Sequence, residues 1–203
     1  MKLYYKPGAC SLASHIILKE IGHDFEIESV DTDKQVTESG VDFSTINARG
    51  YVPVLKLDDG AFLTEGAAVL QYLADQNPEA DLAPEPGTLE RARLQELLNF
   101  TSSELHKDFG PFFSANATDK EKLSAKENVE RKMEYFESIF SDGRNYLLGD
   151  KFSVADVYLF VVSSWAIPTG IGLDRWPGVF AFSKRVASRI AVQDAMRTEG
   201  LLN

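Results

Sequence analysis

Residues 2–22 read KLYYKPGACSLASHIILKEIG. The first four of them predict a short strand, and residues 12–21 predict a helix that is closed by Gly22. Cys10, the only cysteine of the chain, stands at the junction between the two. A thiol in the first turn of a helix faces unpaired backbone N–H groups and the positive end of the helix dipole, and both favour the thiolate. Cys10 is therefore either an inert, buried side chain or a thiol that reacts with a molecule outside the chain.

The rest of the first eighty residues alternates between strand and helix patterns. Residues 25–30 predict a second strand, and the looser stretch 31–46 predicts one short helix. Residues 52–63 predict a β-hairpin about their central Asp-Asp-Gly, and residues 65–76 predict a further helix. The resulting order, β-α-β-α-β-β-α, is typical of a compact α+β module whose first strand–helix–strand unit is parallel.

A segment rich in proline divides the chain into two domains. Residues 77–87 contain three prolines and a glycine, which is typical of a linker. Beyond this segment nearly all of the hydrophobic periodicity is helical. We therefore expect an α+β domain at residues 1–77, a linker at 78–86 and an all-helical domain at 87–203.

Two patterns organise the predicted helical domain. The first is a stripe of large apolar side chains with helical spacing, Val129, Met133, Phe136 and Phe140. The second is Ser153-Val154-Ala155-Asp156, which has the spacing of a capping box and precedes an almost wholly apolar run. The run predicts a central, buried helix, and we interpret the box as structural.

Composition narrows the range of partners. The chain has 203 residues and a formal net charge of −10, which argues against nucleic acid or an anionic membrane as a partner. No apolar stretch approaches the roughly 20 residues that span a bilayer, and residues 1–4 do not begin a signal peptide. We therefore expect a cytoplasmic protein, in which the thiol is kept reduced.

The α+β module with a cysteine after its first strand resembles the thioredoxin fold. A dithiol mechanism is excluded, because Ala13 occupies the position of the second cysteine in a C-x-x-C motif. Pro53, just before the third strand, has two interpretations. It either marks a simple strand edge or forms a cis peptide bond that turns the backbone of Val52 toward the thiol. An exposed backbone of that kind can pair with a peptide-like ligand.

A possible ligand site lies at the start of the helix at residues 65–76. Backbone N–H groups there can bind a carboxylate, and the Glu65 side chain can accept a hydrogen bond from an ammonium group. The alternative is that Glu65 only complements the helix dipole. Taken together with Cys10 and Val52, this pattern fits a small peptide with a free α-amino-acid end and a central thiol, which is the chemistry of glutathione.

Over essentially its whole length, the chain resembles a bacterial beta-class glutathione S-transferase. The stretches that carry this resemblance are residues 1–15, Val52-Pro53, residues 63–66, Glu104-Leu105-His106-Lys107 and the Ser153–Asp156 box. It implies the glutathione transferase architecture, a thioredoxin-like domain followed by an all-helical domain that forms the site of the second substrate. It also implies glutathione as co-substrate, no metal, and a homodimer.

The resemblance also implies roles for individual residues. Cys10 forms a mixed disulfide with glutathione or contacts its sulfur, and Val52 pairs through its backbone with the cysteinyl unit ahead of cis-Pro53. Glu65 and Gly66 hold the γ-glutamyl end. The residues that close the pocket from the second domain, in part across a dimer, are Asn99, Ser103, Glu104, His106 and Lys107. Without the resemblance, a lone helical histidine such as His106 would be interpreted as structural.

Two positions depart from the family pattern. Gln35 stands where family members often have a lysine that contacts the glycine carboxylate of glutathione, and Lys34 is adjacent. Gly66 stands where a serine is frequent, so a hydroxyl is lost while the backbone N–H remains. Neither change removes the chemistry that the family carries out.

The predicted activity is the conjugation of reduced glutathione to apolar electrophiles, together with thiol transfer through Cys10, and a role in detoxification. Ser11 is a candidate hydroxyl for stabilising the thiolate of glutathione. The second-substrate wall would come from residues that are equally explicable as core, namely Phe109, Phe112, Phe113, Trp165 and Ile167. The alternative function is a non-catalytic carrier or regulatory protein of the same fold that binds glutathione or a hydrophobic ligand.

Overall fold

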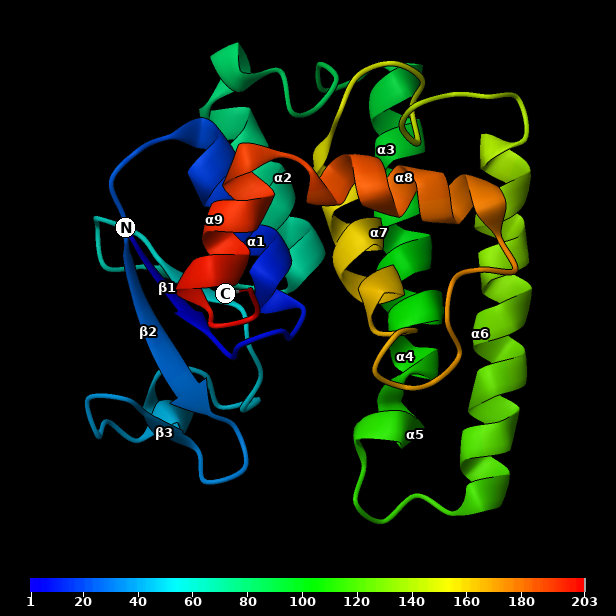
Figure 1. The fold of residues 1–203 in the computed structure, drawn as a ribbon. Coiled ribbons are helices and arrows are strands. Elements are labelled where there is room, and N and C mark those ends of the chain that lie inside the picture. The colour runs from blue at the N-terminus through cyan, green and yellow to red at the C-terminus, as the bar shows by residue number, and fades with distance from the viewer. Residues whose placement is uncertain (203) are drawn as a thin grey trace. The chain divides into compact units, whose positions relative to one another are not determined.

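The computed structural model describes residues 1–202, and these form two compact units (Figure 1). The first unit contains Met1–Ala83 together with the C-terminal segment that begins at Ser188. The second unit is Pro84–Ala187. Each unit is described separately below.

The first unit is built on a five-stranded mixed sheet with the order β3-β2-β1-β4-β5. Strand β1 is parallel to β2 and antiparallel to β4, so that Leu3 lies opposite both Ile27 and Leu55. The parallel β1–α1–β2 unit confirms the sequence prediction. The strands are β1 Lys2–Tyr5, β2 Glu26–Asp31, β3 Val36–Thr37, β4 Val54–Lys56 and β5 Phe62–Thr64.

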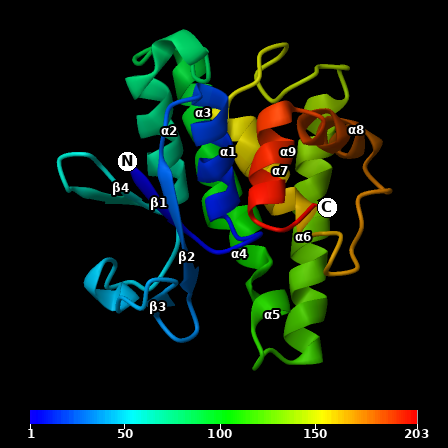
Figure 2. The same cartoon turned by 60° about the vertical axis from the view of Figure 1, so that its left-hand side comes forward.

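Helices cover one face of this sheet (Figure 2). The helices of the first unit are α1 Ser11–Ile21, α2 Gly66–Gln76 and α9 Ile190–Thr198, with short 3₁₀ turns η1 Phe43–Thr45 and η2 Pro78–Ala80. Helix α1 ends as predicted at Gly22, whose left-handed φ of 79° lets its N–H reach the carbonyl of Leu18. The face of the sheet away from α1 and α2 carries a separate buried cluster of Tyr4, Val30, Phe43 and Val54.

Helix α9 packs beside α1 in both views, the red helix against the blue one (Figures 1 and 2). At the N-terminal end of α9, the Arg189 guanidinium donates to both carboxylate oxygens of Glu20 on α1, at 2.6 and 2.9 Å. The predicted helical domain at residues 87–203 included this helix, whereas its contacts group it with the first unit. Sequence periodicity shows that a helix is amphipathic, but it does not show which partner covers its apolar face.

The second unit is entirely helical in its regular structure. The elements are α3 Leu89–Phe100, a π-helical turn η3 Thr101–Leu105, α4 His106–Asp108, α5 Gly110–Phe113, α6 Asp119–Phe140, α7 Val154–Ser164 and α8 Pro177–Ala187. The stripe predicted on α6 is buried, as is nearly all of α7. None of the helices within residues 1–202 is long and apolar enough to cross a membrane.

The capping box at Ser153 and Asp156 is confirmed. The Asp156 carboxylate accepts hydrogen bonds from the N–H and the hydroxyl of Ser153 at 2.8 and 2.7 Å, and from the N–H of Leu147 at 2.8 Å. Burial raises the pKa of Asp156 to about 6, against the opposing effect of these hydrogen bonds. This single carboxylate therefore joins the start of α7 to the loop before it.

Candidate functional site

Cys10 lies at the N-terminal boundary of α1, where the chain leaves β1. A tight turn, closed by the Ala9 N–H donating to the Lys6 carbonyl at 3.0 Å, brings the chain from strand to helix. Cys10 already has helical backbone angles, and its carbonyl accepts from Ala13 N–H at 3.1 Å. The side chain is partly exposed, which excludes the buried position of the alternative interpretation.

The Cys10 thiol points at the segment before β4. Its Sγ donates to the carbonyl oxygen of Val52 at 3.3 Å, and the Val52–Pro53 peptide bond is cis. Of the two interpretations of Pro53, the structure therefore has the cis form, in which the backbone of Val52 faces the thiol. A peptide-like ligand that pairs with this backbone would have its own sulfur close to Cys10.

Ser11 follows Cys10 but is oriented differently. Its hydroxyl is fully buried, accepts from the Lys6 N–H at 3.1 Å and donates to the Lys6 carbonyl at 3.3 Å. Both hydrogen-bonding functions of the hydroxyl thus hold the turn between β1 and α1. This geometry gives Ser11 a positioning role in the loop, in contrast to the ligand-facing hydroxyl that was expected.

Glu65 and Gly66 form the start of α2. Glu65 has a φ of +68°, which is uncommon for a residue with a side chain, and its carbonyl accepts the first hydrogen bonds of the helix from Ala68 and Val69 at 2.9 Å. Its carboxylate is exposed and pairs with Arg49 at 2.9 Å. The site therefore combines helix-start N–H groups with a solvent-facing carboxylate, as an α-amino-acid group requires.

Gln35 is engaged within the protein. Its Nε2 donates to the carbonyls of Thr32 at 2.6 Å and Gly50 at 3.2 Å, which links the β2–β3 turn to the loop before Val52. The neighbouring Lys34 ammonium pairs with Asp31 at 2.9 Å and is exposed. Gln35 thus positions the loop that carries Val52, and Lys34 is the residue with a positive charge next to it in the sequence.

Gly50 provides a test of the link that the Gln35 side chain forms between the β2–β3 turn and the loop before Val52. Replacing Gly50 with alanine would put a Cβ 2.7 Å from Gln35 Oε1, at a φ of +71°. We expect Gly50→Ala to lower the free energy of unfolding by about 1–2 kcal/mol more than Gly60→Ala, which has a φ of +89° and nothing within 4 Å. Urea unfolding measures both. Equal losses would show that backbone strain alone acts and that the Gln35 amide does not constrain the loop.

In the second unit, the expected ligand residues lie on and next to the π-helical turn η3. Ser103 donates its hydroxyl to the carbonyl of Asn99 at 2.9 Å, and the Glu104 carboxylate pairs with Lys132 of α6 at 3.1 Å. Lys132 also pairs with Asp108 on α4. The π turn is a frequent feature of functional sites, because its wider spacing reorients the side chains that follow it.

His106 is half-buried directly after η3. Its Nδ1 lies 3.0 Å from the Tyr158 hydroxyl of α7, and its ring meets Trp165 edge to face with centroids 4.9 Å apart. Burial, with a smaller effect of the Lys107 ammonium, lowers the pKa of His106 to about 4. His106 is therefore neutral at pH 7 and can supply a hydrogen bond, while Lys107, exposed beside it, carries the positive charge.

The apolar residues that were expected to line the second-substrate site differ in burial. Phe109 is fully buried and belongs to the core, whereas Phe113 and Ile167 are 60% and 67% exposed. Trp165 contacts both Phe109 and Phe113, with its ring centroid 5.7 Å from that of Phe109 and 5.5 Å from that of Phe113. Phe112 is half-buried, so Phe112, Phe113 and Ile167 are the members of this set that can contact a ligand directly.

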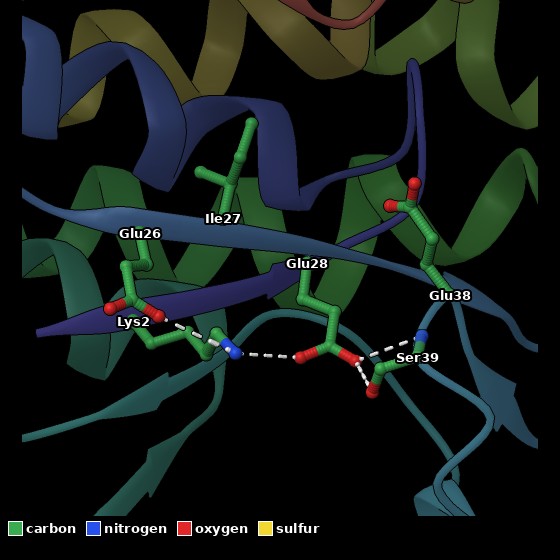
Figure 3. A pocket seen from close by; sticks show the side chains of 6 residues that line it. All are labelled: Lys2, Glu26, Ile27, Glu28, Glu38 and Ser39. Atoms are coloured by element: carbon green, nitrogen blue, oxygen red, sulfur yellow. Dashed lines mark hydrogen bonds and ion pairs between the residues drawn. The ribbon is translucent and has the colours of Figure 1, made fainter.

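A separate pocket on the outer side of β2 is a structural network (Figure 3). Lys2 donates to Glu28 at 2.8 Å, Glu28 also accepts from the Ser39 hydroxyl at 2.5 Å, and Ile27 points to the opposite side of the strand. Burial raises the pKa of Glu28, but hydrogen bonds from Lys2, Ser39 and Thr37 outweigh it and lower the pKa to about 2. These groups satisfy one another.

Sequence reasoning missed three residues that each hold a candidate site residue of their own unit. Arg49 pairs with Glu65, Lys132 holds Glu104, and Tyr158 holds His106. No local motif marks these residues, because each acts on a partner that is distant in sequence. Among residues 1–202, no group of three or more His, Cys, Asp or Glu side chains is arranged to hold a metal ion.

Comparison with known proteins points to one family. The sequence family "Glutathione S-transferase, N-terminal domain" matches residues 8–76, and "Glutathione S-transferase, C-terminal domain" matches residues 100–189. Glutathione S-transferase GstA of Escherichia coli O157:H7 is 43% identical over 201 residues, covering 99% of this chain and 100% of that protein.

Two solved structures are similar throughout. A sphingomonad glutathione S-transferase complexed with glutathione has a TM-score of 0.95 and 45% identity, and the match covers 99% of this chain and 100% of that one. A bacterial beta-class glutathione S-transferase from Sphingomonas chungbukensis has a TM-score of 0.96 and 44% identity, with both chains covered completely.

Proposed function

We propose that this chain, which belongs to the glutathione S-transferase family and to its bacterial beta class, binds glutathione beside Cys10 and uses it in two reactions. These are thiol transfer through Cys10 and conjugation to an apolar electrophile. The observation that carries the proposal is the Cys10 Sγ 3.3 Å from the carbonyl of Val52. A ligand whose cysteinyl unit pairs with Val52 has its sulfur within reach of this thiol.

Thiol transfer needs the Cys10 sulfur, glutathione and a disulfide between glutathione and another thiol. The Cys10 thiolate attacks the glutathione sulfur of that disulfide, forms a mixed disulfide with glutathione and releases the other thiol as its thiolate. A second glutathione thiolate then attacks the glutathione sulfur of the mixed disulfide, which yields oxidised glutathione and restores the Cys10 thiolate. The helix start at α1 favours the thiolate in each step.

Conjugation uses the sulfur of glutathione as the nucleophile. The glutathione thiolate attacks the carbon of an electrophile such as an aryl halide, the C–S bond forms, and halide leaves with the bonding electrons. The chain stabilises and orients the thiolate. A cysteine thiol stabilises a neighbouring thiolate less well than a hydroxyl does, and Ser11 is occupied by Lys6. We therefore expect conjugation to be modest.

The remaining ligand contacts in the proposal follow the family resemblance. Glu65 and Gly66 hold the γ-glutamyl end, and Lys34 is the positive charge available for the glycine carboxylate in place of Gln35. The second unit is proposed to contribute its η3 and α4 residues, and neutral His106 can donate a hydrogen bond to a thiolate sulfur. These second-unit residues are Asn99, Ser103, Glu104, His106 and Lys107.

The proposal also includes a cytoplasmic homodimer that acts in detoxification. Tyr51 and Phe62 of the first unit are exposed apolar side chains that an interface between copies could cover. Sedimentation velocity tests the dimer, and a monomer at micromolar concentration would contradict it. Turnover of a panel of electrophiles with glutathione tests the second substrate, and binding of glutathione without any turnover would favour a carrier.

Glu65→Gln tests how the ligand is held. We expect the KM for glutathione, measured with an aryl halide at saturating concentration, to rise about tenfold, because a hydrogen bond to a charged group contributes about 1.5–3 kcal/mol. The expected kcat changes less, since the reacting sulfur is at the other end of the ligand. Arg49→Gln is the matched control, because it removes the 2.9 Å partner of Glu65 and keeps the carboxylate.

Three outcomes separate the possibilities. An unchanged KM in Glu65→Gln contradicts the role of Glu65. An equal rise in Arg49→Gln assigns the effect to the ion pair between the two side chains. A native protein that neither binds nor turns over glutathione contradicts the proposed function itself, and isothermal titration with glutathione detects that case.

A further inference from the structure

Glu199, near the C-terminus, is a buried carboxylate that the proposed reactions do not use. Its side chain is 0% exposed. Burial of an ionised carboxylate is costly unless hydrogen bonds compensate for the lost water. The position of Glu199 therefore depends on the donors that surround it.

Two hydrogen-bond donors compensate for the burial of the Glu199 carboxylate. They lie on either side of Cys10 in the sequence. Glu199 Oε2 accepts from the backbone N–H of Gly8 at 2.9 Å, and Oε1 lies 2.9 Å from Nδ1 of His15. Gly8 belongs to the turn that leads into α1, and His15 lies on α1 itself. One carboxylate thus ties the turn before the thiol to the helix that begins at it.

The end of α9 is built to place this carboxylate. Glu199 is the last residue before Gly200, whose φ of +72° ends the helix while the N–H of Leu201 reaches back to the Met196 carbonyl at 2.8 Å. The Leu201 side chain then lies over Gly8, 3.4 Å from where a Cβ would stand. Both a hydrogen bond and an apolar contact from this segment therefore act on the same residue of the turn.

We propose that Glu199 is a positioning residue for Cys10: through Gly8 and His15 it holds the turn and the first helix in the geometry that keeps the thiol at the helix start. The inference rests on the proposed function, in which the Cys10 thiolate is the reactive group. The C-terminal segment accordingly takes part in setting the reactivity of a thiol near the opposite end of the chain.

Length and charge of the side chain can be separated by substitution. Glu199→Asp keeps the charge but is one methylene too short to reach both Gly8 and His15. Glu199→Gln keeps the length: its oxygen can still accept from Gly8, and its nitrogen can donate to His15 Nδ1 once the imidazole takes the tautomer with its proton on Nε2. A positioning role therefore predicts a loss in Glu199→Asp and retention in Glu199→Gln.

The quantity to measure is the rate at which iodoacetamide alkylates Cys10, the only thiol of the chain, at pH 7. Mass spectrometry monitors the reaction. We expect a rate about fivefold lower in Glu199→Asp and within about twofold of native in Glu199→Gln, given about 1 kcal/mol for one hydrogen bond. Circular dichroism confirms that each variant is folded. The KM for glutathione should rise together with the loss of alkylation rate.

Two controls remove other charges from the same region. Glu20→Gln weakens the ion pair with Arg189 at the far end of α9, and Asp194→Asn removes an exposed carboxylate that pairs with Arg197 at 2.9 Å. Neither residue contacts the turn that contains Gly8. Both variants should alkylate at the native rate.

Each remaining outcome overturns the proposal. A native alkylation rate in folded Glu199→Asp would show that Glu199 is only a structural contact. An equal loss of alkylation rate in Glu20→Gln would assign the effect to the general packing of α9 against α1. An equal loss of alkylation rate in Glu199→Gln would assign it to the charge of the side chain. If Glu199→Asp does not fold, hydrogen exchange of the native protein tests the proposal instead. Rapid exchange of the Gly8 amide would show that its hydrogen bond to Glu199 does not persist. Alkylation needs no glutathione, so a failure of the proposed function is detected separately by titration with glutathione.

Discussion

Cys10→Ser is expected to abolish the glutathione adduct and to reduce thiol transfer to the uncatalysed rate. The serine hydroxyl fits the same space at the start of α1, but it stays protonated at neutral pH and cannot form a disulfide. The chain contains no second cysteine that could substitute. Mass spectrometry of the protein incubated with oxidised glutathione measures the adduct, and a coupled glutathione reductase assay measures the transfer.

Conjugation should respond differently to the same substitution. Because the sulfur of glutathione is the nucleophile there, turnover of an aryl halide should persist in Cys10→Ser, and a hydroxyl at this position can even support the thiolate. Ser11→Ala keeps the Cys10 sulfur and should therefore still form the glutathione adduct, although it removes the hydrogen bonds to Lys6 that hold the turn. An adduct that survives in Cys10→Ser, or a native thiol that stays unmodified, would contradict thiol transfer through Cys10.

The part of the site around Cys10 could be predicted because it is encoded locally. A strand, a breaker and a helix in immediate succession place the thiol at the helix start, and Pro53 followed by a strand restricts the neighbouring backbone to two arrangements. The α6 stripe and the capping box at Asp156 are equally local. In each case, residues within one turn or one strand decide the geometry.

The rest depends on contacts between segments that are far apart in the sequence. The family resemblance implies a ligand-binding lysine at the position of Gln35, whereas the Gln35 amide donates to the carbonyl of Gly50, 15 residues away. Glu199 reaches Gly8 across 191 residues. The neutral state of His106 follows from burial within the helical unit, which spacing alone does not reveal. A single sequence specifies these contacts only through the complete fold.

Asp156→Ala is expected to lower the free energy of unfolding by about 4 kcal/mol, more than any other substitution proposed for this chain. The substitution leaves the buried N–H groups of Ser153 and Leu147 without their acceptor, and each such group costs about 1–3 kcal/mol in addition to the lost helix cap. Urea unfolding followed by tryptophan fluorescence measures the effect. Both tryptophans, Trp165 and Trp176, lie in the same unit as Asp156, so the signal reports on that unit.

The chain contains a matched control for this substitution. Thr118 and Glu121 form a second capping box at the start of α6, with the Glu121 carboxylate accepting from the Thr118 N–H at 2.7 Å. Both residues lie at the surface, where water replaces a lost acceptor. Glu121→Ala should therefore cost much less than Asp156→Ala. Comparable losses would show that helix capping, and not burial of the carboxylate, determines the contribution of Asp156.

The pH dependence identifies the buried carboxylate more directly. The folded pKa of Asp156, about 6, lies above the ordinary value of 3.8, so the folded state takes up a proton before the unfolded state does as the pH falls. Its contribution is fully present below the unfolded pKa and is lost as the pH rises through 6. The difference in stability between native protein and Asp156→Ala should thus grow by about 1 kcal/mol from pH 8 to pH 5. A difference that stays constant or shrinks over this range would show that the hydrogen bonds from Ser153 and Leu147 outweigh the cost of burial.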